Sequence, residues 1–201
     1  MIDYRSPWMD DELEMFRDAA KRFIESAIVP NDARWRDQHH VDRDIWNKAG
    51  EVGLLCTDIP AEYGGVGGDA RHEAVVAEEM GRHGISSFGH VVHSILAHYV
   101  LNYGSEQQKR NWLPRMASGE LVGAIAMTEP GAGSDLQAVR ARAVREGDQY
   151  VLNGSKTFIS NGLHAGLVGV VVKTDPTKGA KGISIIMVET RGLPGYRVGR
   201  V

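Results

Sequence analysis

The hydrophobic pattern of the chain changes near residue 120, and this change limits what the chain can fold into. Before it, apolar residues recur at the three-then-four spacing of helices buried on one face. After it, short runs rich in β-branched residues alternate with glycine and charged turns. The sequence therefore predicts an α+β protein, with an all-α domain over residues 1–119 and an antiparallel sheet over 120–201.

Five helices are predicted in the first domain, over residues 10–29, 42–52, 70–81, 88–100 and 105–118. Pro30 should end the first, because proline cannot donate to a helical hydrogen bond. Ser105 and Gln108 have the spacing of a capping box at the start of the fifth. The fourth helix should bury one continuous stripe, made of Phe88, Val91, Val92, Ile95, Leu96, Tyr99 and Val100.

The strands predicted for the second domain are LVGAIAM, QYVLNG, KTFIS, LVGVVVKT, GISIIMVE and the final GYRVGRV. Glu146-Gly147-Asp148 should form one turn, and Asn153-Gly154 should form a type I′ hairpin between QYVL and KTFIS. The last run reaches Val201 without a closing turn or cap, so the sheet looks unfinished and a fragment is expected.

Composition excludes several classes of protein. The 23 Lys and Arg against 26 Asp and Glu, with a pI near 6.2, leave no overall basic footprint for nucleic acid. No apolar run approaches the roughly 20 residues of a transmembrane helix. The first twenty residues are acidic from Asp3 onward and lack the apolar stretch of a secretory signal, so a cytoplasmic location is expected. Cys56 is the single cysteine, which excludes an intrachain disulfide and a CxxC site.

A glycine-rich loop, Gly131 to Asp135, follows the first predicted strand. Its backbone N–H groups and the Ser134 hydroxyl could approach phosphate oxygens, or the loop could be a simple tight turn. It matches neither the dinucleotide-binding nor the P-loop pattern. The chain has no GxSxG motif, and Ser134 is followed by a predicted strand rather than a helix, which disfavours a hydrolase nucleophile.

The eight histidines raise the question of a metal site. His90 and His93 lie one helical turn apart, and His98 follows on the same predicted helix. There is no HExxH motif and no cysteine partner, so a structural role for these histidines is favoured over metal binding.

Three linked motifs carry a resemblance to a known family. The stretch AMTEPGAGSDLQAVRARA resembles a signature of the acyl-CoA dehydrogenases, and GSEQQKRNWLPRMASGEL before it and LNGSKTFISNG after it match that family in order and spacing. Within the family the chain is most similar to the long-chain type. The resemblance implies an N-terminal helical domain, a β-barrel-like middle domain and a C-terminal helical bundle, which residues 1–201 do not include.

The resemblance also implies an activity. Family members oxidise acyl-CoA thioesters to trans-2-enoyl-CoA, remove an α-proton, pass the β-hydride to N5 of FAD, and hand electrons to an electron-transfer flavoprotein. It further implies roles in fatty acid β-oxidation, a dimer or tetramer formed largely through the bundle, and a mitochondrial matrix location in a eukaryote. Two alternatives stay open: a non-catalytic acyl-CoA-binding subunit, and a flavin monooxygenase or nitroalkane oxidase on the same scaffold.

Site residues follow from the motif match. The segment expected along the flavin comprises Ile125, Ala126, Met127 and Thr128. Gly133 and Ser134 match positions near the FAD pyrophosphate, and Ser134 also one near the CoA portion of the substrate. The triplet expected to cover the isoalloxazine ring, where relatives often carry Trp and Thr, is Phe158, Ile159 and Ser160.

No catalytic residue is expected within this chain. The family's catalytic glutamate lies in the bundle, beyond Val201, so this chain alone is expected to be inactive. Glu129 and Asp135 are carboxylates of the motif's turn, where they should fix the loop by accepting backbone N–H groups.

Overall fold

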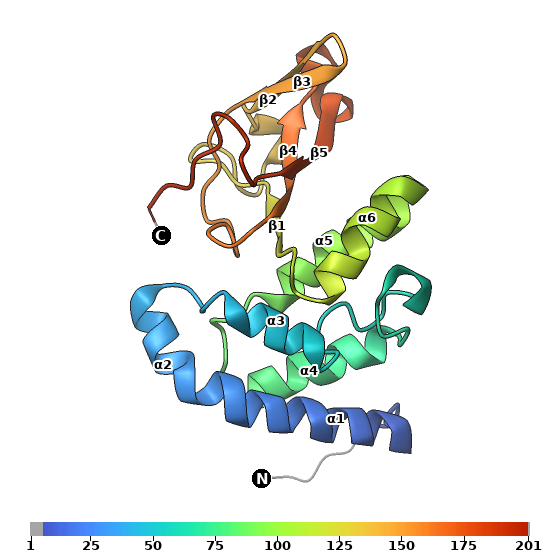
Figure 1. Cartoon of the computed structure of the whole chain (residues 1–201). Helices are drawn as coiled ribbons and strands as arrows, with labels where there is room; N and C mark the ends of the chain where they lie inside the picture. Colours follow the sequence, from blue (N-terminus) through green and yellow to red (C-terminus); the bar gives the residue numbers. More distant parts are fainter. Residues whose placement is uncertain (1–5, 201) are drawn as a thin grey trace. The chain divides into compact units, whose positions relative to one another are not determined.

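The computed structural model describes residues 6–200. The chain divides between Leu121 and Val122 into a helical unit and a strand unit, each taken by itself below (Figure 1). Asp3 and Val201, which entered the expectations about the two ends of the chain, lie outside the described residues. Within the described range, no helix is long and apolar enough to cross a membrane.

The helical unit contains α1 Asp11–Phe23, the π-helix Ile24–Ile28, α2 Val29–Gln38, α3 Asp44–Glu51, a 3-10 turn Ala61–Tyr63, α4 Ala70–Arg82, α5 His90–Tyr103 and α6 Glu106–Ala117. The capping box of α6 is confirmed. The Ser105 hydroxyl accepts from the Gln108 N–H at 3.3 Å, and the Gln108 Oε1 accepts from the Ser105 N–H at 2.8 Å.

The expectation that Pro30 ends the first helix is wrong. A π-helical turn over Ile24–Ile28 follows α1, and α2 continues with Pro30 in its first turn. The wider π-helical turn places Pro30 in the first turn of α2, where backbone N–H groups have no acceptor within the helix. The N–H that proline lacks is therefore not needed there. Helical structure therefore continues to Gln38 and ends at His39, whose φ of 63° is left-handed.

Helix α5 buries a different face from the predicted stripe. Phe88, Leu96 and Val100 are buried as expected, whereas Val91 and Ile95 are 47% and 43% exposed. The buried face is completed instead by polar and small residues of the helix: His90, His93, Ser94 and Ala97. The hydrophobic period alone therefore predicted the buried face of the helix only in part.

The buried histidines of α5 pack in the core, and this explains the rotation of the helix. His93 is fully buried, its ring lies 5.2 Å from that of Trp46, and its Nε2 is 3.1 Å from the Met116 carbonyl. Burial lowers the pKa of His93 to about 4 and also lowers the pKa of His90. Both rings are therefore neutral near pH 7, which makes their burial among apolar groups acceptable.

The strand unit contains β1 Gly123–Ala126, β2 Arg142–Glu146, β3 Gln149–Asn153, β4 Leu167–Lys173 and β5 Ile183–Glu189. The sheet is mixed, and the expectation of a purely antiparallel sheet is wrong. β4 pairs β1 in parallel and meets β2 in parallel at one position, while β2–β3 and β4–β5 are antiparallel (Figure 1). A barrel is not confirmed over the described strands.

The turn predicted at Glu146-Gly147-Asp148 is confirmed, and the hairpin predicted at Asn153-Gly154 is wrong. Gly147, at φ 63°, turns the chain between β2 and β3. Gly154 begins no second hairpin, because KTFIS leaves the sheet and forms a loop. A Cβ on Gly154 would lie 2.5 Å from the Ala141 Cβ, so this glycine allows close packing. The final GYRVGR, described to residue 200, also forms no strand.

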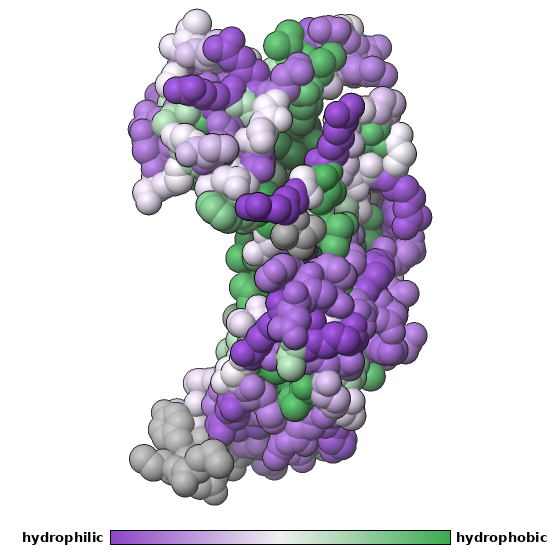
Figure 2. All heavy atoms as spheres, turned by 90° about the vertical axis from the view of Figure 1, so that its left-hand side faces the viewer, coloured by the Kyte–Doolittle hydropathy of each residue, from purple (hydrophilic) through white to green (hydrophobic). Residues whose placement is uncertain are grey.

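The core of the strand unit is built from small and β-branched residues. Ala124, Ala126, Ala165 and Val168 form one buried cluster, against which the Ile159 side chain packs. Other apolar side chains of this unit remain exposed, among them Val144 at 54% and Val151 at 39%. Figure 2 shows apolar surface between polar residues on the face that it displays.

Candidate cofactor site

The two sequence motifs expected to meet a flavin lie side by side in the strand unit. The Thr157 N–H donates to the Thr128 carbonyl at 2.9 Å, and the Asn161 side-chain amide donates to the Gly123 carbonyl at 3.0 Å. The first bond joins the segment that leaves β1 to the 156–160 loop, and the second ties the start of β1 to Asn161, the residue that follows this loop. One backbone bond and one side-chain bond thus hold β1 and the segment after it beside residues 156–161, at one corner of the sheet.

Lys156 fixes this corner, and the sequence motifs gave no role to it. Its ammonium group donates to the Met127 carbonyl and to Glu129 Oε1, each at 2.9 Å. The Lys156 side chain is 9% exposed and that of Glu129 is 7% exposed, so the ion pair is buried. The only signal in the sequence was a lysine two residues before Phe158, and that signal does not identify its partner.

Glu129 holds the glycine-rich loop, as the sequence predicted. Its carboxylate accepts from the Arg140 N–H at 2.7 Å and from the Ala141 N–H at 2.9 Å. Burial alone would raise the pKa of Glu129, but the Lys156 hydrogen bond and these two N–H donors outweigh it and hold the pKa below its ordinary value. Asp135 likewise accepts from the Gln137 N–H at 3.0 Å, a turn-fixing contact.

The corner presents hydrogen-bond donors that the chain itself does not use. Within residues 6–200, the backbone N–H groups of Met127, Thr128, Ile159 and Ser160 donate to no acceptor. The hydroxyls of Thr128 and Ser160 also have no bonding partner there. Met127, Thr128 and Ile159 are only half-buried, so these groups can reach a ligand. Unused donors at this depth fit a molecule rich in acceptors.

Phe158 is exposed and strained. Its side chain is 92% exposed, and its φ of 56° lies in the left-handed region that non-glycine residues rarely adopt. An exposed aromatic ring held in such a backbone conformation does not stabilise the free chain. These two features fit a flat ring system of a ligand that stacks on Phe158. Ile159 differs, because it packs on the core and reaches the site through its backbone alone.

The glycine-rich loop is a tight turn with an open side. Glu129 and Ala132 exchange backbone hydrogen bonds of 2.9 and 3.1 Å across Pro130-Gly131, which confirms the turn. A Cβ added at Gly131 or Gly133 would meet nothing within 4 Å, and neither residue has a positive φ. The chain's own geometry therefore requires neither glycine, and the open side of the loop leaves room for another molecule to approach the backbone closely.

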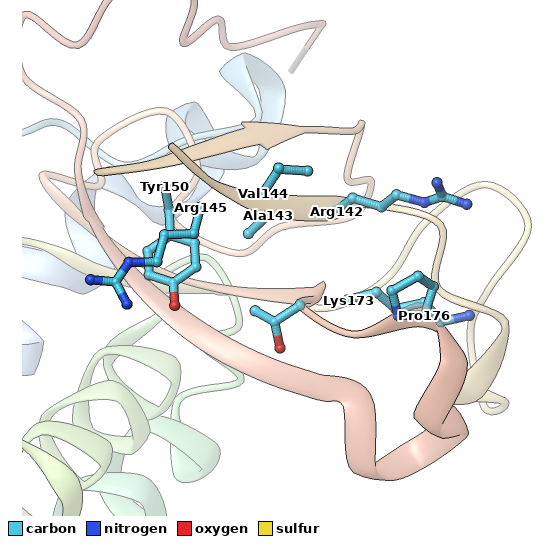
Figure 3. A pocket seen from close by; sticks show the side chains of 8 residues that line it. Arg142, Ala143, Val144, Arg145, Tyr150, Lys173 and Pro176 are labelled. Carbon is cyan, nitrogen blue, oxygen red and sulfur yellow. The ribbon is translucent and has the colours of Figure 1, made fainter. Parts of the chain in front are cut away.

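Two shallow hollows lie on the strand unit. One, of about 340 Å³, lies beside the loop and is lined by Glu129, Pro130, Gly131, Arg140, Ala141, Gly154 and Ser155. The other, of about 250 Å³, lies between the β2–β3 hairpin and the end of β4 (Figure 3). Neither is lined by the nine expected cofactor residues, which gather instead on the open corner. No group of side chains suited to a metal ion occurs among the described residues.

Comparison with known proteins identifies the class to which these two units belong. Residues 10–120 match the N-terminal domain of acyl-CoA dehydrogenases, and residues 124–201 match the middle domain. The chain belongs to the acyl-CoA dehydrogenase family. Among its relatives is the mitochondrial long-chain specific acyl-CoA dehydrogenase of Sus scrofa, 43% identical over 192 residues, which are 94% of this chain and 44% of that protein.

Other relatives show the range of the family. The acryloyl-CoA reductase (NADH) of Anaerotignum propionicum is 37% identical over 94% of this chain and 49% of its own length. The crystal structure of an acyl-CoA dehydrogenase from Geobacillus kaustophilus superposes with a TM-score of 0.93 at 42% identity, and the match covers 98% of this chain and 52% of that one. The chain thus spans about half the length of the relatives it matches.

Proposed function

We propose that this chain forms the N-terminal and middle part of an FAD-dependent acyl-CoA dehydrogenase, which oxidises an acyl-CoA thioester to the trans-2-enoyl-CoA. The observation that carries the proposal is the corner where the end of β1 meets the 156–160 loop, with its unused donors and its exposed aromatic ring. A related glutaryl-CoA dehydrogenase from Mycobacterium smegmatis, 28% identical with a TM-score of 0.85, was solved in complex with FADH2. When bound, FAD would supply the hydride acceptor.

The residues of the corner fit the polar edge of such a cofactor. Ile125 and Ala126 would lie along the cofactor as the last residues of β1. Met127 and Thr128 would donate to it through their free N–H groups and the Thr128 hydroxyl. Fixed donors of this kind stabilise a flavin that gains negative charge on reduction. Lys156 and Glu129 would hold these donors in place from behind.

The loop on the other side fits the ring and the phosphates. Phe158 would stack on the ring system, while Ser160 would offer its hydroxyl and its N–H. Gly133 and the exposed Ser134 would approach the pyrophosphate, and Ser134 also the CoA portion of the substrate. The absence of any intrachain need for Gly133 supports this assignment.

The base that removes the α-proton lies, in this proposal, on a glutamate outside residues 1–201. Glu129 is unsuited to that role, because its carboxylate is buried, held ionised and occupied by Lys156 and two N–H donors. An electron-transfer flavoprotein would accept the electrons; a solved electron transferring flavoprotein of Acidaminococcus fermentans has a TM-score of 0.86 to this chain. The complete enzyme would act in β-oxidation as a homodimer or homotetramer, in the bacterial cytoplasm or the mitochondrial matrix.

The visible absorption spectrum of the purified chain tests the proposal. After incubation with FAD and removal of free cofactor, a retained flavin band is expected, which a long-chain acyl-CoA added without oxygen leaves unbleached. Phe158→Ala should weaken FAD binding by about tenfold, the effect of losing one stacking contact of 1–1.5 kcal/mol. Tyr103→Ala, at an aromatic residue 83% exposed on the helical unit, is the matched control and should bind FAD normally.

Two results would contradict parts of the proposal. A folded chain that retains no FAD would reject the corner as a cofactor site. Bleaching by acyl-CoA would show that a base within residues 1–201 removes the α-proton, and would reject the assignment of that base to a glutamate elsewhere.

A further inference from the structure

The peptide group between Met127 and Thr128 has a single bonding partner in the described part of the chain. Its carbonyl accepts from the Lys156 ammonium group at 2.9 Å, and its N–H has no acceptor. The groups before and after it are held by other bonds. Ala126 pairs with β4 as the last residue of β1, and the Thr128 carbonyl accepts from the Thr157 N–H at 2.9 Å. The direction of this one peptide group therefore depends on Lys156.

The lysine also determines where the Thr128 N–H points. A trans peptide group directs its carbonyl and its N–H to opposite sides. No cis peptide bond occurs among residues 6–200, so the bond to the Met127 carbonyl turns the Thr128 N–H away from Lys156. Lys156 is buried, whereas Met127 and Thr128 are half-buried. The unused N–H is therefore directed away from the buried side of the corner.

The ion pair behind this peptide group presents its positive member to it. The Glu129 carboxylate is occupied by Lys156 and by two backbone N–H groups, at 2.7 to 2.9 Å. The ammonium group is the member of the pair that contacts the Met127 carbonyl. Linked hydrogen bonds polarise one another where water is excluded, and bonds from a charged donor are the stronger ones. The Thr128 N–H is therefore a stronger donor than an isolated peptide N–H.

Stability alone does not explain a buried ammonium group at this position. Apolar side chains of similar volume often replace a buried ion pair without loss of stability. The 156–160 loop is already joined to the segment after β1 by the bond between Thr157 and Thr128. What Lys156 adds is the direction of the peptide group between Met127 and Thr128.

We propose that Lys156 is a positioning residue of the flavin corner. Through the Met127 carbonyl it directs and strengthens the Thr128 N–H, which then favours the reduced over the oxidised cofactor. A fixed donor stabilises a molecule more after that molecule gains negative charge than before. The inference rests on the proposed function, because it assigns the Thr128 N–H to the cofactor. It goes further, since a side chain that does not touch the cofactor sets its reduction potential.

The double variant K156M/E129Q tests the inference and leaves no charge unpaired in the interior. The ammonium group is removed, and the amide that replaces the Glu129 carboxylate keeps an oxygen for the Arg140 and Ala141 N–H groups. K178M is the matched control, because it removes a surface lysine of the same unit, 67% exposed. Circular dichroism establishes that each chain is folded before further measurement.

The first measurement needs no cofactor. Residual dipolar couplings of the ¹⁵N-threonine-labelled chain report the direction of each threonine N–H. In the unmodified chain and in K178M, we expect the Thr128 coupling to fit the single direction in the structure. In K156M/E129Q it should fall toward an averaged value, while Thr157, bonded to the Thr128 carbonyl, keeps its coupling. A Thr128 coupling that is averaged in the unmodified chain overturns the inference, and so does one that the double variant leaves unchanged.

The second measurement is the midpoint potential of FAD bound to each chain. K156M/E129Q should weaken binding of the reduced cofactor about tenfold more than binding of the oxidised one, which lowers the potential by about 30 mV for a two-electron couple. K178M should leave the potential unchanged. Equal potentials in the double variant and the unmodified chain overturn the inference. An unmodified chain that retains no FAD rejects the proposed function instead, and the Thr128 coupling then still decides whether Lys156 directs the peptide group.

Discussion

Replacing Lys156 by methionine should strongly destabilise the strand unit. The substitution keeps most of the side-chain length but removes the cation that pairs with Glu129 and donates to the Met127 carbonyl. Both members of the pair are less than a tenth exposed, so water cannot take the place of the ammonium group. Loss of one partner from a buried ion pair costs about 3–5 kcal/mol. That is a large share of the roughly 5–15 kcal/mol that holds a domain folded.

The pH dependence separates this mechanism from a general packing defect. In the unmodified chain the folded pKa of Glu129 is lowered, so the pair stabilises the fold above the ordinary value of 4.5 and loses its effect as pH falls through the folded pKa. In Lys156→Met the unpaired carboxylate should have a raised pKa and should accept a proton on acidification. The difference in stability between the two proteins should therefore be greatest near pH 7 and shrink below pH 4.5.

Urea unfolding followed by circular dichroism, from pH 7 to pH 4, measures both effects. Lys178→Met is the matched control, because Lys178 is 67% exposed and pairs with Asp175 on the surface. This control should cost less than about 1 kcal/mol. A cost of less than about 1 kcal/mol for Lys156→Met at pH 7, or a larger cost that does not vary with pH, would refute the reasoning.

Two further predictions concern His93 and Phe158. Burial lowers the pKa of His93 from 6.5 to about 4, so the neutral ring contributes stability that is complete above pH 6.5 and is lost as pH falls toward 4, about 3 kcal/mol in all. Urea unfolding followed by tryptophan fluorescence should show this loss, and a stability unchanged between pH 7 and 4.5 would contradict it. Phe158→Gly should raise the stability of the free chain by about 1 kcal/mol through relief of the left-handed backbone while weakening FAD binding; a destabilised variant in thermal unfolding would count against strain at this residue.

Much of the helical unit could be predicted because its signals are local. The spacing of apolar residues located the helices, and Ser105 with Gln108 marked the start of α6, since a capping box depends on residues three apart. The face that α5 buries could not be predicted in this way. It depends on His93, which becomes a core residue through the rings and carbonyl that surround it in the fold.

In the strand unit, too, local features could be predicted and contacts between distant residues could not. Its β-branched runs predicted most strands, and the motif match predicted which residues form the candidate cofactor site. The sequence carried no information on strand neighbours, so the parallel pairing of β1 with β4 was missed, and KTFIS was assigned to a strand although it closes over the end of β1.

By itself, then, the sequence determined the order of the two units, the type of most elements and the family of the chain. Only the tertiary structure decided the contacts between distant residues: the Lys156–Glu129 pair behind the site, the bond from Lys156 to the Met127 carbonyl, and the unused donors at the edge of the site. The physical reason is that helix periods, caps and turns depend on neighbours along the chain. Strand pairing, burial of charge and the meeting of separate loops depend on groups that only folding brings together.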